Sequence, residues 1–253
     1  MSVRTQRAFT LVELLVVISI LMLLVSLLVP SVGRGIEMSR RAACMMNTRE
    51  LARACKIYAL NEQEHRGSPA RELPAVVPAG SNWAAQNAAG LFLLIKYRSV
   101  APGSFICPSV DDAKAGALAP GDTVFTQFSQ TSLSYSYQSM IGGKISLAWT
   151  QLYPSLALVA DDNPRVNFDG LLSPLLAKTE HARAHQSMAG VPEGQNVGFL
   201  DESAKWLVVP KVTTRSNQDD WIYAPKTGDG GDGKSTYDYN NPNVPFEDVY
   251  LIP

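Results

Sequence analysis

The sequence has few cysteines and no excess of charge of either sign. Its 253 residues include three cysteines, too few for a disulfide-rich scaffold. The 22 Lys and Arg nearly balance the 23 Asp and Glu, and the net charge of -1 excludes both a globally basic nucleic-acid-binding protein and an acidic tail protein. The hydrophobic content of 46% excludes wholesale disorder. The G-x-S-x-G and H-E-x-x-H motifs are also absent, so a hydrolase has no support and we expect no enzymatic activity.

The balanced total conceals two unlike segments. Residues 1–66 contain nine basic and five acidic side chains (+4), whereas residues 67–253 contain 13 and 18 (-5). The first segment includes a long apolar run, Phe9–Val29, whose only charge is Glu13. At ~1.5 Å per helical residue this run spans roughly 30 Å, about the thickness of a bilayer core. We therefore expect a membrane-spanning helix at residues 9–29.

An ordinary secretory signal peptide is the alternative for this run. The uncharged stretch Leu14–Val29 has nearly the length of a signal-peptide core, and Ser31-Val32-Gly33 could serve as a cleavage site. Two observations favour the membrane anchor. Glu13 lies inside the run, where a carboxylate costs a few kcal/mol and therefore needs a partner. The helical pattern also continues beyond the cleavage site.

An amphipathic helix is predicted for residues 30–65. Apolar residues recur there every three or four positions, with basic residues mostly between them, until glycine and proline appear. Pro30 removes one backbone hydrogen bond, so we expect it to bend the helix without ending it. The prediction is one helix of about 50 residues, and the alternative is two separate helices.

The remaining residues, 66–253, are predicted to form one α+β domain with an antiparallel sheet and a loop-rich C-terminal region. One helix comes first and several short strands follow, separated by Gly, Pro and Asp turns. The expected elements are a loop at Leu73–Asn82, a helix at Asn87–Tyr97, and strands at Phe105–Val110, Ser132–Gln138, Leu156–Ala160 and Val197–Val209.

The leader Ala8-Phe9-Thr10-Leu11-Val12-Glu13, followed by an apolar helix, resembles the prepilin signal of type IV pilins and type II secretion pseudopilins. The resemblance implies that a prepilin peptidase removes residues 1–8, cutting between Ala8 and Phe9, and methylates the new amine. Glu13 then becomes the fifth mature residue and would neutralise the Phe9 amine of a neighbouring subunit. Pro30 matches the helix-bending proline of the family. Ala8 departs from it, because glycine is usual there.

The resemblance further implies a pilin-like structural subunit of a bacterial cytoplasmic membrane, with its N-terminus in the cytoplasm and its C-terminal domain outside. The expected partners are the membrane, the prepilin peptidase and other pilin or pseudopilin subunits; no nucleic acid is expected. The subunit would assemble into a type IV pilus-like or type II secretion filament. The alternative is a membrane-anchored extracytoplasmic module that binds a glycan, calcium or a protein and does not assemble.

A second, looser resemblance extends downstream. Large pilin-like proteins of planctomycete-type bacteria carry recurring blocks after the same leader and end in an "H-x9-D-G" hairpin. That hairpin is degenerate here, because Glu202 replaces its glycine and His185 lies sixteen residues before Asp201. The blocks that resemble the family are Cys44–Leu51 with Tyr58, Phe105–Ser109, Ser134–Tyr137, Leu158–Asp161 and Asn196–Trp206.

The cysteines are candidates for a disulfide. Cys44 and Cys55 lie eleven residues apart, about 16 Å along a helix, so they cannot pair with each other. Either could pair with Cys107, which would leave one thiol free. The alternative is that all three are buried as apolar side chains.

Two further groups are candidate metal ligands. The segment Thr227–Pro242 holds Asp229, Asp232 and Asp238, which could bind calcium through oxygen atoms; it weakly resembles the calcium loop of major pseudopilins, and a solvated loop is the favoured interpretation. His181 and His185 have helical i, i+4 spacing, and zinc could use such a pair. We expect instead that both histidines lie in surface loops.

Overall fold

The computed structural model describes residues 10–61, 72–74, 83–110, 133–138, 154–162, 182, 184–187, 190–213, 219–222 and 251–252. The chain divides into two compact units, Met1–Ser39 and Arg40–Pro253.

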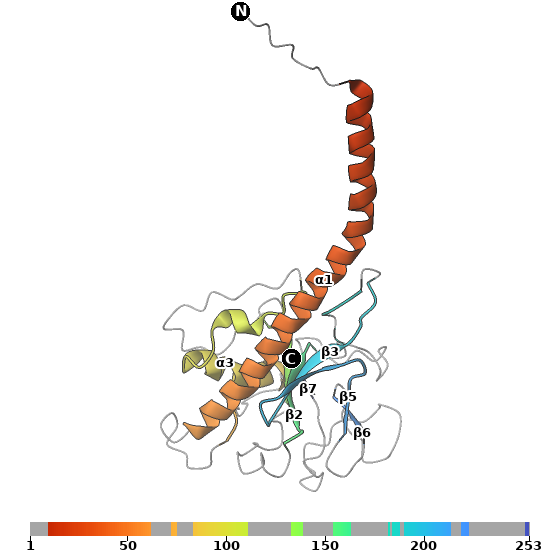
Figure 1. Cartoon of the computed structure of the whole chain (residues 1–253). Helices are drawn as coiled ribbons and strands as arrows, with labels where there is room; N and C mark the ends of the chain where they lie inside the picture. Colours follow the sequence, from red (N-terminus) through yellow and green to blue (C-terminus); the bar gives the residue numbers. More distant parts are fainter. Residues whose placement is uncertain are drawn as a thin grey trace, which may run out of the picture. The chain divides into compact units, whose positions relative to one another are not determined.

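The helix α1 runs from Leu11 to Leu60 and belongs in part to each unit (Figure 1). Its 50 residues continue through Pro30 without a break. This confirms the prediction of one helix of about 50 residues, and the alternative of two helices is wrong. A bend at Pro30 stays a prediction.

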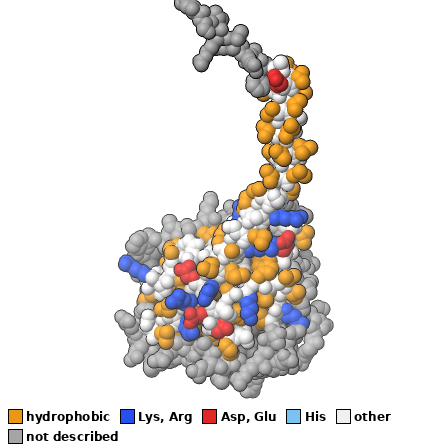
Figure 2. Space-filling model, in the orientation of Figure 1, with side chains coloured by type: hydrophobic (Ala, Val, Ile, Leu, Met, Phe, Trp, Pro, Cys, Tyr) orange, Lys and Arg blue, Asp and Glu red, His pale blue; other side chains and the backbone are white. Residues whose placement is uncertain are grey.

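The part of α1 in the first unit exposes its apolar side chains. From Leu11 to Val32 the large hydrophobic residues are 42–81% exposed, and Figure 2 shows hydrophobic side chains covering this part of the helix. One stretch reaches a mean hydropathy of 3.0, and the helix is long and apolar enough to cross a membrane. Three serines within it donate their hydroxyls to the carbonyl three residues earlier at 2.8 Å, which keeps these polar groups satisfied without water: Ser19, Ser26 and Ser31.

The second unit contains a five-stranded antiparallel sheet in the order β4-β3-β2-β1-β7. A separate two-stranded sheet pairs β5 with β6. Together with α1 these sheets confirm the predicted α+β class. The strands are β1 (Tyr135–Gln138), β2 (Ala157–Asp161), β3 (Gln195–Phe199), β4 (Ala204–Leu207), β5 (Lys211–Thr213), β6 (Asp219–Trp221) and β7 (Leu251–Ile252).

The predicted strand at Phe105–Val110 is wrong. The chain forms a short 3-10 helix, η1 (Pro102–Phe105), and then a turn. Proline stands at the start of η1, where its fixed φ favours a helical turn and its missing N–H is not needed. The apolar composition of Phe105–Val110 suggested a strand, but it is explained by the burial of Phe105, which is 0% exposed.

The core of the second unit lies between α1 and the sheet. The buried side chains of α1 recur at helical spacing, so that one face of the helix meets the core. A second helix, α3 (Trp83–Lys96), contributes Leu91 and Leu94 to the same core, and strands β1 to β3 supply their buried residues. The buried residues of α1 are Cys44, Thr48, Leu51, Ala52, Ala54, Cys55, Tyr58 and Ala59.

Gly198 on β3 allows the backbone of α1 to approach the sheet closely. A Cβ atom at this position would lie 2.7 Å from the carbonyl oxygen of Thr48 and 3.5 Å from the Cβ of Ala52. The distance of 2.7 Å is shorter than any normal contact of a Cβ atom. The contacted atom belongs to the backbone of α1, which cannot shift without moving the helix. The helix and the sheet would therefore have to separate locally.

We expect Gly198→Ala to lower the free energy of unfolding of the full chain in detergent by about 1–3 kcal/mol, the usual effect of overpacking. Gly103→Ala is the matched control, because a Cβ at Gly103 would meet nothing within 4 Å. Thermal unfolding followed by circular dichroism measures both variants. Equal midpoints for the two variants would contradict the close approach.

The hairpin between β3 and β4 contains a non-glycine residue in the left-handed region. Glu202 has φ 67° and donates its N–H to the carbonyl of Phe199 at 2.9 Å. Glu202 is the last residue of a three-residue hairpin loop, the left-handed position at which glycine is favoured. The Glu202 carboxylate also pairs with Lys56 of α1 at 2.6 Å, and both side chains are about one-third exposed. Glu202 therefore combines a strained backbone with an ion pair to α1. The large pilin-like proteins that this chain resembles have glycine at the same position.

We expect Glu202→Gly to be about 1 kcal/mol more stable than Glu202→Ala. Both variants lose the ion pair, which is worth at most about 1 kcal/mol because it is partly exposed, whereas only glycine relieves the left-handed backbone. Thermal unfolding of the two variants side by side gives the difference. An alanine variant as stable as the glycine variant would show that the turn is not strained.

Candidate functional site

The first candidate site is the N-terminal end of α1. Thr10 precedes the helix, and its hydroxyl accepts a hydrogen bond from the N–H of Glu13 at 3.3 Å. The carboxylate of Glu13 reaches back, and its Oε2 accepts the Thr10 N–H at 2.9 Å and the Thr10 hydroxyl at 2.8 Å. This reciprocal pattern is a capping box, which satisfies backbone donors that the first helical turn leaves without partners.

The capping box places the only acidic group of the apolar run at the helix end. Both hydrogen bonds go to Oε2; among the described residues, Oε1 of Glu13 makes no hydrogen bond. One carboxylate oxygen therefore holds the cap while the other can accept a further donor. Ala8 and Phe9, the residues of the predicted cleavage site, lie outside the described residues.

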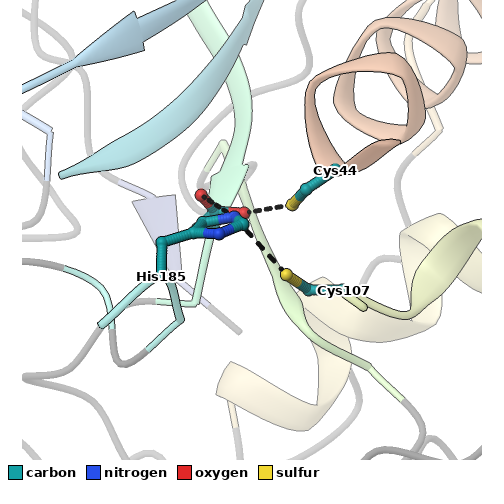
Figure 3. Close-up of side chains that lie close together, drawn as sticks. Cys44, Cys107 and His185 are labelled. Carbon is teal, nitrogen blue, oxygen red and sulfur yellow. Dashed lines mark hydrogen bonds and ion pairs between the residues drawn. The ribbon is translucent and has the colours of Figure 1, made fainter. Parts of the chain in front are cut away.

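The second candidate site is a buried group of four side chains in the second unit. Its ligand atoms all lie within 4.8 Å of one another: the Sγ atoms of Cys44 and Cys107, a carboxylate oxygen of Asp161 and a ring nitrogen of His185. Figure 3 shows the side chains of Cys44, Cys107 and His185 lying close together. Cys44 donates to Asp161 Oδ1 at 2.8 Å. His185 Nε2 lies 3.5 Å from Cys107 Sγ and 3.6 Å from Asp161 Oδ2. All four residues are 0% exposed.

Each of these side chains comes from a different element. Cys44 belongs to the buried face of α1, and Asp161 is the last residue of β2. Cys107 follows η1, and this segment is tied to the sheet by the N–H of Ser134, which donates to the carbonyl of Phe105 at 2.9 Å. Asn47 of α1 donates from Nδ2 to the carbonyl of Ile106 at 3.0 Å. Hydrogen bonds thus connect the segment of Cys107 both to α1 and to the residue before β1.

A small irregular hairpin holds His185 in place. The N–H of Glu193 donates to the His185 carbonyl at 3.2 Å, and Gln186 pairs with Pro192. His185 has φ 60°, an uncommon conformation for a residue with a side chain. Its ring packs edge-on against Trp206 with the centroids 5.4 Å apart.

Hydrogen bonds orient the imidazole and the carboxylate. Nδ1 of His185 lies 2.9 Å from the hydroxyl of Ser109, which leaves Nε2 directed toward the two cysteines and the carboxylate. Nε2 also lies 3.1 Å from Nδ2 of Asn196. The backbone N–H of Asn196 donates to Asp161 Oδ2 at 2.6 Å, and the hydroxyl of Tyr135 lies 3.2 Å from Cys44 Sγ.

Burial shifts the acidities of the group strongly. Loss of water raises the pKa of Asp161 to about 7 and raises the pKa of the Cys44 thiol well above its usual value. Cys107 is shifted in the opposite direction, because hydrogen bonding to Cys44 and the contact with His185 lower its pKa to about 5. Burial raises the pKa of Cys55, which lies outside this group, to about 12. The four side chains together are a set that could hold a metal ion.

The structure corrects the prediction for His185 and shows which cysteine lies near Cys107. The expectation that His185 lies in a surface loop is wrong: its side chain is fully buried, and its backbone is in a bend and not in a helix. His181 lies outside the described residues. All three cysteines are buried free thiols, and Cys44 is the one that lies close to Cys107. A disulfide between these two stays a prediction.

The predicted calcium ligands Asp229, Asp232 and Asp238 lie outside the described residues, so calcium binding there stays a prediction.

The same segment also fits a motif that the sequence analysis missed. Residues 228–235 read GDGGDGKS and match the spacing G-x-x-x-x-G-K-[ST] of phosphate-binding loops. That motif indicates a nucleotide site only between a strand and a helix, and residues 228–235 also lie outside the described part of the chain.

Comparison with known proteins identifies the N-terminal segment. Residues 3–29 match the family described as the prokaryotic N-terminal methylation motif. The chain therefore carries a prepilin-type signal, and a pilin-like classification fits the long apolar helix and the antiparallel sheet. The signal and the exposed apolar helix support membrane anchoring and processing by a prepilin peptidase. No curated protein and no solved structure matches the chain.

Proposed function

We propose that the protein is a pilin-like or pseudopilin structural subunit that assembles through α1 into a type IV pilus-like or type II secretion filament. The observation that carries the proposal is the match of residues 3–29 to the methylation motif on a helix whose apolar side chains are 42–81% exposed. An exposed apolar surface of this length needs lipid or other helices around it. A filament core of packed helices supplies such surroundings once the subunit leaves the bilayer.

Leader removal makes the helix competent for assembly. Cleavage between Ala8 and Phe9 would create a positive amine one residue before Thr10, at the end of the helix where Glu13 lies. An amine of one subunit buried among neighbouring helices needs a counter-charge, because an unpaired buried charge is strongly unfavourable. Glu13 Oε1 supplies an acceptor for it while Oε2 keeps the cap.

The signal supports a topology with the apolar helix in the membrane, and the proposal extends it to the whole chain. The N-terminus lies in the cytoplasm, residues 9–29 cross the cytoplasmic membrane, residues 30–65 continue the helix, and residues 66–253 form the extracytoplasmic domain. The motif suggests a structural subunit and not an enzyme. No observation on the described residues favours the alternative of a binding module that does not assemble.

Site-specific photo-crosslinking tests the proposal in cells of the native host. A photoreactive phenylalanine analogue replaces Leu21, which is 54% exposed on the apolar part of α1. We expect adducts with a second copy of the chain or with another subunit that carries the same methylation motif. The same analogue in place of Lys205, which is exposed on β4, is the control. Adducts of Leu21 with lipid and with no such subunit would contradict filament assembly.

A further inference from the structure

The buried group of Cys44, Cys107, Asp161 and His185 has no role in the proposed filament. Assembly uses the apolar part of α1 in the first unit, whereas these four side chains are fully buried in the second. Two thiols, a carboxylate and an imidazole are the side chains that bind zinc in proteins. They converge here from four segments that are far apart in the sequence.

The spacing of the four atoms fits a tetrahedral ion. With bonds of about 2.3 Å to sulfur and about 2.0 Å to nitrogen or oxygen, the edges of a zinc tetrahedron measure roughly 3.3–3.8 Å. Nε2 of His185 lies 3.5 Å from Cys107 Sγ and 3.6 Å from Asp161 Oδ2. Cys44 Sγ contacts the other carboxylate oxygen of Asp161, Oδ1, at 2.8 Å through a hydrogen bond whose proton a metal would displace, and only one of the two oxygens would bind the ion. No pair of ligand atoms is more than 4.8 Å apart.

The surroundings orient the ligands as in metal sites. A metal-bound histidine usually uses its second ring nitrogen for a hydrogen bond that fixes the ring, and here Nδ1 meets the Ser109 hydroxyl at 2.9 Å. The Asn196 N–H holds Asp161 Oδ2 at 2.6 Å. His185 keeps a left-handed backbone, a strain of the kind that recurs at ligand-holding positions.

We propose that Cys44, Cys107, Asp161 and His185 bind one Zn²⁺ in a closed, four-coordinate structural site. Thiolate and imidazole together favour zinc over calcium or magnesium, which prefer oxygen ligands. Four protein ligands leave no open position for a substrate, so the site is structural. It would join α1, the segment after η1, the end of β2 and the His185 hairpin within the second unit.

A disulfide between Cys44 and Cys107 is the competing use of the same sulfur atoms. A disulfide uses only the two sulfur atoms, whereas a metal ion uses all four groups. A buried carboxylate next to two thiols is unfavourable unless a cation or hydrogen bonds compensate for it. One divalent ion compensates for all of the acidic groups at once.

The metal content and intact mass of the full chain test the proposal. The chain is purified in detergent without a histidine tag from cells grown with zinc. We expect about one Zn²⁺ per chain, and a visible tetrahedral cobalt–thiolate spectrum when Co²⁺ replaces zinc. Cys44→Ala and His185→Ala should each lower zinc retention by at least about tenfold. Cys55→Ala is the matched control, since it removes another buried cysteine of α1 that lies outside the group.

Measurements on the wild-type chain test zinc binding even if a variant fails to fold. Removal of the metal should lower the thermal midpoint, and zinc but not calcium should restore it. A wild-type chain that holds no zinc and takes up no Co²⁺ overturns the proposal, whether its thiols are free or Cys44 is joined to Cys107. Zinc retention that falls equally in the Cys55→Ala control overturns it as well.

Discussion

Glu13→Leu is expected to leave the chain in the membrane and to lower its incorporation into filaments by at least about tenfold. Leucine makes the apolar run more hydrophobic, so insertion is unimpaired. The Phe9 amine of a neighbouring subunit then lacks a counter-charge among packed helices, and an unpaired buried charge costs about 3–5 kcal/mol. Immunoblots of membrane and filament fractions, prepared from the native host, measure the two quantities separately.

Glu13→Gln separates the charge of Glu13 from its role as a cap. Glutamine also serves in capping boxes, so this variant keeps the hydrogen bonds with Thr10 but carries no charge. We expect it to fail in assembly as leucine does, because only a carboxylate neutralises an amine. A glutamine variant that assembles like the wild type would show that Glu13 acts by capping α1 and not by pairing with a neighbour.

Ala8→Leu is expected to slow leader removal by at least about tenfold, so that the uncut precursor accumulates. The residue before the cut is small in this class of signal, and a pocket shaped for glycine or alanine excludes a branched side chain at a cost of about 1–3 kcal/mol. An intact-mass measurement of membrane extracts gives the ratio of precursor to mature chain. Ala8→Gly is the control and should be cut at least as fast as the wild type.

The two predictions are linked through the amine. A precursor that keeps residues 1–8 has no amine at Phe9, so the Ala8→Leu chain should be absent from filaments even though its Glu13 is intact. A precursor that enters filaments with its leader attached would contradict the proposed pairing of Phe9 with Glu13.

Local patterns predicted α1 well and the segment after α3 poorly. The 50-residue helix follows from an uninterrupted apolar run and then a helical repeat, both of which are properties of neighbouring residues. The strands at Ser132–Gln138, Leu156–Ala160 and Val197–Val209 are confirmed as β1, β2 and the β3–β4 hairpin. The segment Phe105–Val110 has the composition of a strand, but it forms the end of η1 and a turn, and Asn47 of α1 donates to its Ile106 carbonyl.

The buried group of four side chains could not be predicted from the spacing of its residues in the sequence. Cys44, Cys107, Asp161 and His185 become neighbours only when β2 pairs with β1 and β3 and the Cys44 face of α1 packs into the core. The helical spacing of His181 and His185 does not indicate the groups that contact His185, which are Cys107, Ser109 and Asn196. A usable signal was present nonetheless. Three of the blocks that resemble large pilin-like proteins each contain one residue of the buried group: Cys44, Cys107 and Asp161.

Mass spectrometry of the mature N-terminus of the wild-type chain tests the central claim most directly. If the apolar run is a processed prepilin helix, the mature chain begins at Phe9 and carries one additional methyl group on its amine. A chain that begins at Met1 or Ser2 would show that the motif is not processed. A chain that begins after Ser31-Val32-Gly33 would show that the run is an ordinary signal peptide, which would contradict filament assembly through α1.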